Sequence, residues 1–277
     1  MKLELKYKFD YIHENYNNVN FTISYDIKNL LQLGTYNGVD SFNTICSKLQ
    51  NSKIILVEAN KMHNNDIINN YSHIYPKNKV IIINKAIVLN EYNDKYIEFY
   101  LNNQCSSIIK PEDYSNIIRV ETIKFNDILE EYNLYNLELL MIDLEGLDYN
   151  LLMEIDFNLI PKLKYIFFEG CHIDDKERSI DVKTFFPTFG KKFKLLIDKL
   201  VKYNFILKIL DPGFYDIIFE KVEINRDNYT DYLIDTKIID YYKNSQNNVN
   251  NFIFYQMTKF KTYYNFKIIE KYSFNKS

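Results

Sequence analysis

The sequence predicts an α/β fold in which a mostly parallel sheet, with helices on both faces, ends in an antiparallel hairpin. Two observations support this prediction. From Asn29 onward, short apolar runs alternate with helical patterns, which is typical of β-α-β units. Near the end of this alternation, only Asp211, Pro212, Gly213 and their neighbours separate two apolar runs. So short a connection cannot hold a crossover helix, and the last two strands must pair antiparallel.

The individual elements follow from the same patterns. The first strand, residues 30–33, stops at Gly34, and apolar residues up to Leu49 are then spaced as one face of a helix. The remaining strands are predicted at residues 53–58, 80–89, 96–101, 137–144, 165–169, 205–210 and 215–222. Further helices are predicted at residues 125–134, 149–159 and 189–203, and a loop at 102–116. We therefore expect an N-terminal extension (1–28), a core domain (29–222) and an aromatic, lysine-rich C-terminal extension (223–277).

Composition limits the classes of partner. A hydrophobic fraction of 47% in 277 residues is typical of a globular chain. The formal charge of −3 offers no general attraction to nucleic acid or anionic membranes, so a small-molecule or carbohydrate partner is favoured. Cys46, Cys105 and Cys171 form no CxxC pair, and no apolar run is long enough to span a bilayer. These features predict a soluble protein of a reducing compartment, the cytoplasm, and leave its oligomeric state open.

The turn after the first strand is the first candidate ligand site. Its run QLGTYNG (residues 32–38) is a G-x-x-x-G at a strand end that opens a helix. Glycines there allow close approach of a ligand, although the same pattern can mark only tight packing. Tyr36 occupies the second glycine position of a dinucleotide-binding pattern, which favours an adenosyl ligand without phosphates over a pyrophosphate.

Carboxylates follow two of the predicted strands. Glu58 ends the second strand, where an acid can accept hydrogen bonds from both hydroxyls of a ribose, unless it is simply solvated. Asp143, Glu145 and Asp148 gather after the strand at 137–144. Their mutual repulsion would be costly without a cation, a positive sulfonium or a shared proton, although Asp148 can also serve as a helix cap.

These motifs resemble the FkbM-type methyltransferase family over residues 29–222. The run QLGTYNG corresponds to the family's glycine turn, VEAN (57–60) to its ribose-binding acid, and IDLEGLD (142–148) to its most distinctive segment. Gln32 stands where the family has an acid, and Tyr36 stands where it has Asn. The resemblance implies a Rossmann-like class I methyltransferase fold, S-adenosylmethionine as cofactor, and a hydroxyl of a sugar or another small molecule as methyl acceptor.

The resemblance also assigns site residues. The Asn84 to Ala86 region is expected near the adenine, and the glycine turn and Glu58 near the amino-acid and ribose parts of the cofactor. The complete set of expected cofactor-binding residues is Gly34, Thr35, Tyr36, Gly38, Glu58, Ala59, Asn84, Lys85, Ala86, Asp143 and Glu145.

Methyl transfer to a hydroxyl requires alignment and removal of a proton. Asp143, Glu169 and His172 are the candidate catalytic groups, although His172 can equally be an ordinary loop residue. Alternatively, Asp143, Glu169 and Asp174 could hold Mg²⁺ through hard oxygen ligands. A second hypothesis, based on Gln32 and Tyr36, is a catalytically inactive Rossmann-like binding or scaffold protein.

Overall fold

The computed structural model describes residues 2–7, 19–24, 26–102, 105–170, 191–210 and 216–222. The chain divides into two compact units, residues 1–172 and 173–277, which are described separately. No helix of the described part of the chain is both long enough and apolar enough to cross a membrane.

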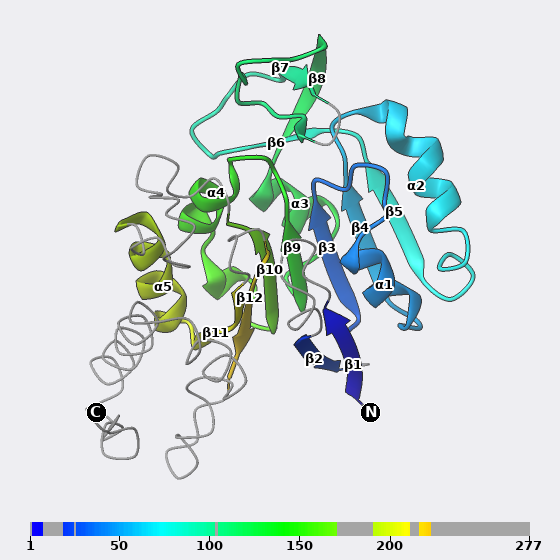
Figure 1. The fold of residues 1–277 in the computed structure, drawn as a ribbon, viewed down its shortest axis with the longest axis vertical. Coiled ribbons are helices and arrows are strands. Elements are labelled where there is room, and N and C mark those ends of the chain that lie inside the picture. Colours follow the sequence, from blue (N-terminus) through cyan, green and yellow to red (C-terminus); the bar gives the residue numbers. More distant parts are fainter. Residues whose placement is uncertain are drawn as a thin grey trace, which may run out of the picture. The chain divides into compact units, whose positions relative to one another are not determined.

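The first unit is built on five parallel strands, which lie in the order β10-β9-β3-β4-β5 (Figure 1). Their bounds are β3 (Asn29–Leu33), β4 (Lys53–Val57), β5 (Lys79–Ile83), β9 (Leu139–Ile142) and β10 (Tyr165–Glu169). The central strands are almost wholly buried, as shown by the fully buried Leu30, Leu31 and Leu33 of β3. Burial on both faces explains why these strands are continuous apolar runs.

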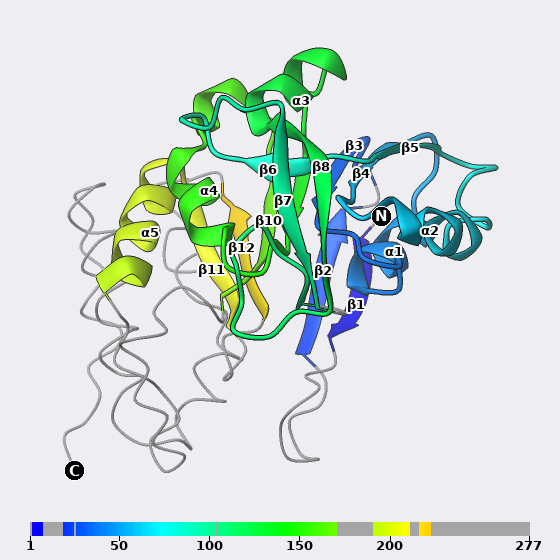
Figure 2. The same cartoon turned by 90° about the horizontal axis from the view of Figure 1, so that it is seen from above.

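Helices connect these strands. Their bounds are α1 (Ser41–Ser47), η1 (Lys61–His63), α2 (Asn64–Asn70), α3 (Phe125–Glu131), α4 (Asp148–Glu154) and η3 (Phe157–Leu159). From β3 the chain proceeds to β4 and β5 on one side, and later to β9 and β10 on the other. Right-handed crossovers in opposite directions place α1 and α2 on one face of the sheet and α4 on the other (Figure 2). The strand order reverses between β3 and β9, and ligands bind at such points in open α/β sheets.

A small sheet is inserted between β5 and β9. It contains β6 (Ala86–Val88), β7 (Tyr96–Leu101) and β8 (Asn116–Lys124) in the order β6-β8-β7, with β6 parallel and β7 antiparallel to β8. Ala86, Phe99 and Val120 form its core. Figure 1 shows it beyond the carboxyl ends of the parallel strands.

The small sheet corrects two predictions. The predicted single strand at 80–89 is wrong, because the chain passes from one sheet to another at Asn84 and Lys85. Asn84 hydrogen-bonds the side chain of Asn64 and the backbone oxygen of Glu58, and this polar anchoring ends β5. The strand β8 was not predicted as a strand at all. The described residues of the predicted loop at 102–116 do form a loop, with two exceptions. Ser107 forms an isolated bridge with Tyr100, and β8 already begins at Asn116.

Two antiparallel hairpins complete the described structure. Within the predicted N-terminal extension, β1 (Lys2–Tyr7) pairs with β2 (Val19–Ser24). In the second unit, α5 (Lys191–Lys202) precedes β11 (Phe205–Leu210), which pairs antiparallel with β12 (Asp216–Lys221). The predicted terminal hairpin, and with it the predicted fold class, is therefore confirmed. The domain limits at residues 29 and 222 stay predictions.

Candidate functional site

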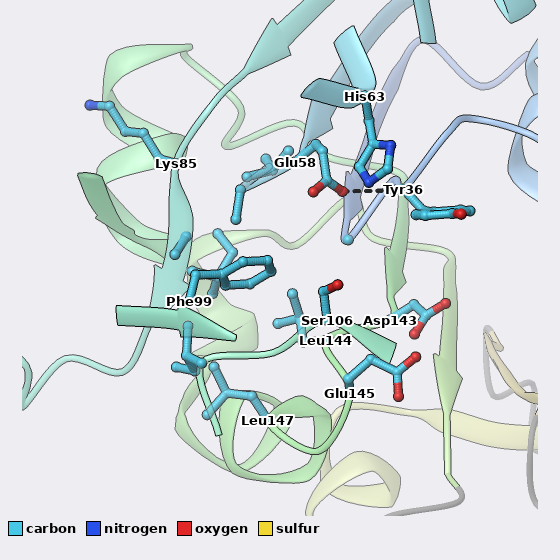
Figure 3. A pocket seen from close by; sticks show the side chains of 16 residues that line it. Tyr36, Glu58, His63, Lys85, Phe99, Ser106, Asp143, Leu144, Glu145 and Leu147 are labelled. Atoms are coloured by element: carbon cyan, nitrogen blue, oxygen red, sulfur yellow. Dashed lines mark hydrogen bonds between the residues drawn. The ribbon is translucent and has the colours of Figure 1, made fainter. Parts of the chain in front are cut away.

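A pocket opens at the carboxyl ends of β3, β4 and β9, where the strand order reverses. It encloses about 610 Å³ of empty space, including its open mouth. Its walls come from the turn after β3, the segment after β4, the small sheet with the loop that follows β7, and the segment after β9 (Figure 3).

The turn after β3 requires glycine at its first position. Gly34 has φ +79°, and a Cβ there would lie 1.7 Å from the backbone oxygen of Asp143. The backbone of Gly34 donates to the oxygen of Val57 at 3.0 Å, and Gly38 donates to Thr35 at 2.9 Å. The first glycine thus allows close contact between β3 and β9, which places the turn against the segment that carries Asp143.

Glu58 connects this turn to the end of β4. Its carboxylate accepts hydrogen bonds from the backbone nitrogens of Tyr36 at 2.7 Å and Asn60 at 2.8 Å. Burial raises the pKa of Glu58 from 4.5 to about 7, and the hydrogen bonds offset only part of that effect. The side chain is only 6% exposed, yet it lines the pocket. Glu58 therefore both holds the glycine turn and presents an acceptor to a ligand.

Tyr36 and His63 form an aromatic edge beside Glu58. Their ring centroids lie 4.5 Å apart in an edge-on arrangement, and a ring nitrogen of His63 lies 3.2 Å from the amide nitrogen of Asn60. Burial lowers the pKa of His63 below its ordinary value, although Asp66 opposes this shift. His63 was not predicted as a site residue, because it lies in an Asn-rich segment without a motif.

The opposite side of the pocket is apolar. Figure 3 shows Phe99 across the pocket from Tyr36 and Asp143. The apolar lining is formed by Val57, Ala59, Ala86, Ile87, Phe99, Ile108, Leu144 and Leu147. Phe99 and Ile108, with Ser106, come from β7 and the following loop, so the small sheet supplies a wall of the pocket. No sequence pattern indicated these three residues, since their approach to the main sheet depends on long-range packing.

Carboxylates gather at the end of β9. One oxygen from each of Asp143, Glu145 and Glu169 lies within 4.8 Å of the others. The Asp143 side chain keeps exposed surface, and it lines the pocket. Its pKa is nevertheless raised well above its ordinary value, first by the protein atoms that displace water around it and then by Glu169, Asp148, Glu145 and Asp40. Such a cluster favours a bound cation or a shared proton.

Asp148 has a structural role beside this cluster. It is 2% exposed and accepts from the backbone nitrogens of Leu144 and Gly146, both at 3.2 Å. Burial raises its pKa to about 7. It stands inside α4, whose N-cap is Leu147, so the suggestion that Asp148 caps this helix is wrong. Its hydrogen bonds instead hold the turn that carries Glu145, whose φ is +51°.

The structure brings most of the predicted site residues to this pocket. Those that line it are Gly34, Tyr36, Glu58, Ala59, Lys85, Ala86, Asp143 and Glu145. Glu169 joins the carboxylate cluster. Three predicted residues support the walls from behind: Thr35 is buried with its hydroxyl 3.4 Å from the oxygen of Val57, Gly38 packs against Tyr71, and Asn84 anchors the end of β5.

Part of the predicted catalytic set cannot be placed. His172 and Asp174 lie outside the described residues, so neither the proposed base His172 nor the metal set of Asp143, Glu169 and Asp174 can be compared with the structure. Among described residues, Glu145 is the third carboxylate beside Asp143 and Glu169.

Comparison with known proteins agrees with this arrangement. A family model described as a methyltransferase FkbM domain matches residues 15–207, which is more than half of the chain. No curated protein matches the sequence significantly.

Solved structures with distant similarity are also methyltransferases. An O-methyltransferase from Bacillus cereus in complex with SAH is 14% identical, with a TM-score of 0.37, over 72% of this chain and 76% of that one. The O-methyltransferase TomG from Streptomyces achromogenes in complex with SAM is 10% identical, with a TM-score of 0.38, over 70% and 72%. Aeropyrum pernix fibrillarin with natively bound S-adenosyl-L-methionine is 14% identical, with a TM-score of 0.37, over 70% and 66%.

Proposed function

Because this chain belongs to the FkbM methyltransferase family, whose members use S-adenosylmethionine, we propose that it methylates a hydroxyl of a sugar, a glycan or another small molecule. One observation carries the proposal: Glu58, the glycine turn and two members of the carboxylate cluster, Asp143 and Glu145, all line a single pocket at the reversal point of the sheet. The cytoplasmic location stays a prediction.

The lining of the pocket suits the separate parts of S-adenosylmethionine. The apolar wall around Phe99 and Leu147 matches a flat adenine, since aromatic and aliphatic side chains cover such a ring without requiring charge. Glu58 supplies acceptor oxygens for the two ribose hydroxyls. The negative end at Asp143 and Glu145 suits the positive sulfonium. Residues of this chain thus fit the cofactor along its whole length.

The cofactor, when bound, supplies a methyl group on a positively charged sulfur. The protein must then align the acceptor oxygen with that methyl and remove the hydroxyl proton. Asp143 is the best-placed acceptor for the proton, because it lines the pocket and because the displacement of water around it, together with the neighbouring carboxylates, raises its pKa and makes it a stronger base. Asp143 would take up the proton that the acceptor hydroxyl loses when its oxygen is methylated.

The carboxylate cluster also allows a metal-assisted variant of the same reaction. Asp143, Glu145 and Glu169 offer three hard oxygen ligands within reach of one ion, which suits Mg²⁺. A bound Mg²⁺ would lower the pKa of the acceptor hydroxyl and remove the need for a general base. Assays with added Mg²⁺ and with EDTA separate the two mechanisms, since only the metal-assisted reaction stops in EDTA.

Calorimetry with S-adenosylmethionine and S-adenosylhomocysteine tests cofactor binding, with NAD as the control dinucleotide. We expect both adenosyl ligands to bind and NAD to fail, because Tyr36 blocks close approach of a pyrophosphate. Methyl transfer is then measured by mass spectrometry on sugars, nucleotide sugars and small phenols. No binding of either adenosyl ligand at millimolar concentration would contradict the proposal, and methylation of amines alone would contradict the assignment to a hydroxyl.

A further inference from the structure

Gln32 is a polar residue in a buried apolar row of the sheet. Its side chain is 1% exposed. In register, it lies between Leu56 of β4 and Met141 of β9, and partners in register on parallel strands point to the same face. A buried amide needs hydrogen-bond partners for both its nitrogen and its oxygen. The position therefore requires an explanation beyond packing.

Only the nitrogen of this amide has a hydrogen-bond partner among the described residues. The nitrogen of Gln32 donates to a carboxylate oxygen of Asp40 at 2.5 Å, and the other oxygen of Asp40 accepts from the backbone of Asn43 at 2.8 Å, capping α1. The oxygen of Gln32 is buried and has no hydrogen-bond partner among the residues that the structure describes. A buried carbonyl without a donor is costly, so a donor from outside the chain would stabilise this arrangement.

The Gln32–Asp40 pair lies directly below the pocket. Gln32, Leu56 and Met141 lie in register on β3, β4 and β9. Two residues further along the chain from each of them are Gly34, Glu58 and Asp143, and all three of these line the pocket. Two residues of a strand span about 6.6 Å. The pair also bridges the two ends of the glycine turn, since Gln32 precedes that turn and Asp40 follows it.

The charge of Asp40 has no cationic partner among the described residues. The ion pairs between described side chains are Lys85 with Glu121 and Lys164 with Glu138. Burial raises the pKa of Asp40. A cation bound beside Asp40 would oppose this effect, because it would stabilise the charged carboxylate.

We propose that Asp40 is the counter-charge for the amino group of the cofactor's methionine part, and that Gln32 positions this group through its unpaired oxygen. This inference rests on the proposed use of S-adenosylmethionine. The amino group is the one cationic part of that molecule with N–H donors, because the sulfonium has none. The unpaired oxygen of Gln32 would accept from this amino group either directly or through one bridging water.

Three ligands and three variants test the inference. S-adenosylmethionine and its decarboxylated form both carry the amino group, whereas methylthioadenosine lacks it. The variants are Asp40→Asn, the exchange Gln32→Glu with Asp40→Asn, and Asp113→Asn as a matched control on an exposed acid that does not line the pocket. Asp40→Asn keeps one acceptor oxygen, which can serve either the Gln32 nitrogen or the backbone nitrogen of Asn43 but not both, so thermal melting checks that the turn stays folded. Dissociation constants are measured by calorimetry at pH 8.

We expect Asp40→Asn to weaken both amino-bearing ligands about tenfold or more, and methylthioadenosine by less than about twofold. The exchange variant should restore the preference for the amino-bearing ligands, and Asp113→Asn should leave all three dissociation constants unchanged. Equal weakening of all three ligands by Asp40→Asn would show that the pair only holds the turn, and would overturn the inference. No weakening at all would also overturn it. Failure of the unchanged protein to bind any of the three ligands would instead refute the proposed cofactor.

Discussion

The free energy of unfolding of the unchanged protein should fall as the pH rises, because Glu58 becomes charged. Replacing Glu58 by Gln should abolish this fall and should also weaken cofactor binding. Burial raises the pKa of Glu58 from 4.5 to about 7 in the folded chain. A group whose pKa is raised on folding contributes stability that is fully present below its unfolded pKa and is lost as the pH rises through its folded pKa. The loss therefore falls between about pH 4.5 and pH 7.

The magnitude follows from those two pKa values. Between pH 5 and pH 8, the titration of Glu58 should lower the free energy of unfolding by about 2.5 kcal/mol. Because the side chain is 6% exposed, solvent screening reduces this figure little. In the Glu58→Gln variant, the new amide can accept from only one of the two backbone nitrogens of Tyr36 and Asn60, which costs about 1 kcal/mol at every pH. The change with pH, rather than the absolute stability, is thus the informative quantity.

Urea unfolding at pH 5, 6, 7 and 8 measures this change for both proteins. Between pH 5 and pH 8, we expect the free energy of unfolding of the unchanged protein to fall by about 2.5 kcal/mol relative to that of the variant. In parallel, S-adenosylmethionine should bind the variant about tenfold more weakly, and its affinity for the unchanged protein should fall below about pH 7, where the acceptor carboxylate is lost. Parallel stability curves would refute the assignment of a raised pKa to Glu58.

Other substitutions test the contribution of each wall of the pocket. Phe99→Ala should weaken S-adenosylhomocysteine about tenfold and lower stability by about 3 kcal/mol, whereas the exposed Tyr96→Ala on the same strand should do neither, as calorimetry and urea unfolding would show. Gly34→Ala should yield no folded protein by circular dichroism, because its Cβ would meet backbone at 1.7 Å, while Gly38→Ala, whose Cβ would meet a side chain at 3.1 Å, should fold with reduced stability. Asp143→Asn should lower turnover about a hundredfold with little loss of cofactor affinity; full activity in a methyl-transfer assay would show that this carboxylate is not the base.

The sequence predicted the parts of the site that depend on parallel strand ends. The carboxyl ends of parallel strands meet at one edge of a sheet, so Gly34, Glu58 and Asp143 could be assigned to one site from their positions after three apolar runs. The reversed terminal hairpin was likewise predictable, because loop length alone excludes a crossover between its strands.

The small sheet could not be predicted for the opposite reason. In the apolar run at 80–89 only Asn84 and Lys85 interrupt the pattern, and it is the non-local pairing of Ala86–Val88 with β8 that assigns the second half of the run to another sheet. Phe99 and Ile108 then reach the pocket through tertiary packing that leaves no trace in local periodicity. His63 and Asp40 were missed similarly, since each acts through a neighbour rather than through a motif.

Phe99 belongs both to the core of the small sheet and to the wall of the pocket. A flat ligand bound against it would therefore complete the core of that sheet, much as a missing side chain would. Each departure of the spent cofactor would leave that core incomplete, and the exchange of cofactor would be a repeated partial unpacking of residues 86–124. The rate of cofactor release and the local stability of the small sheet would then depend on the same contacts of Phe99.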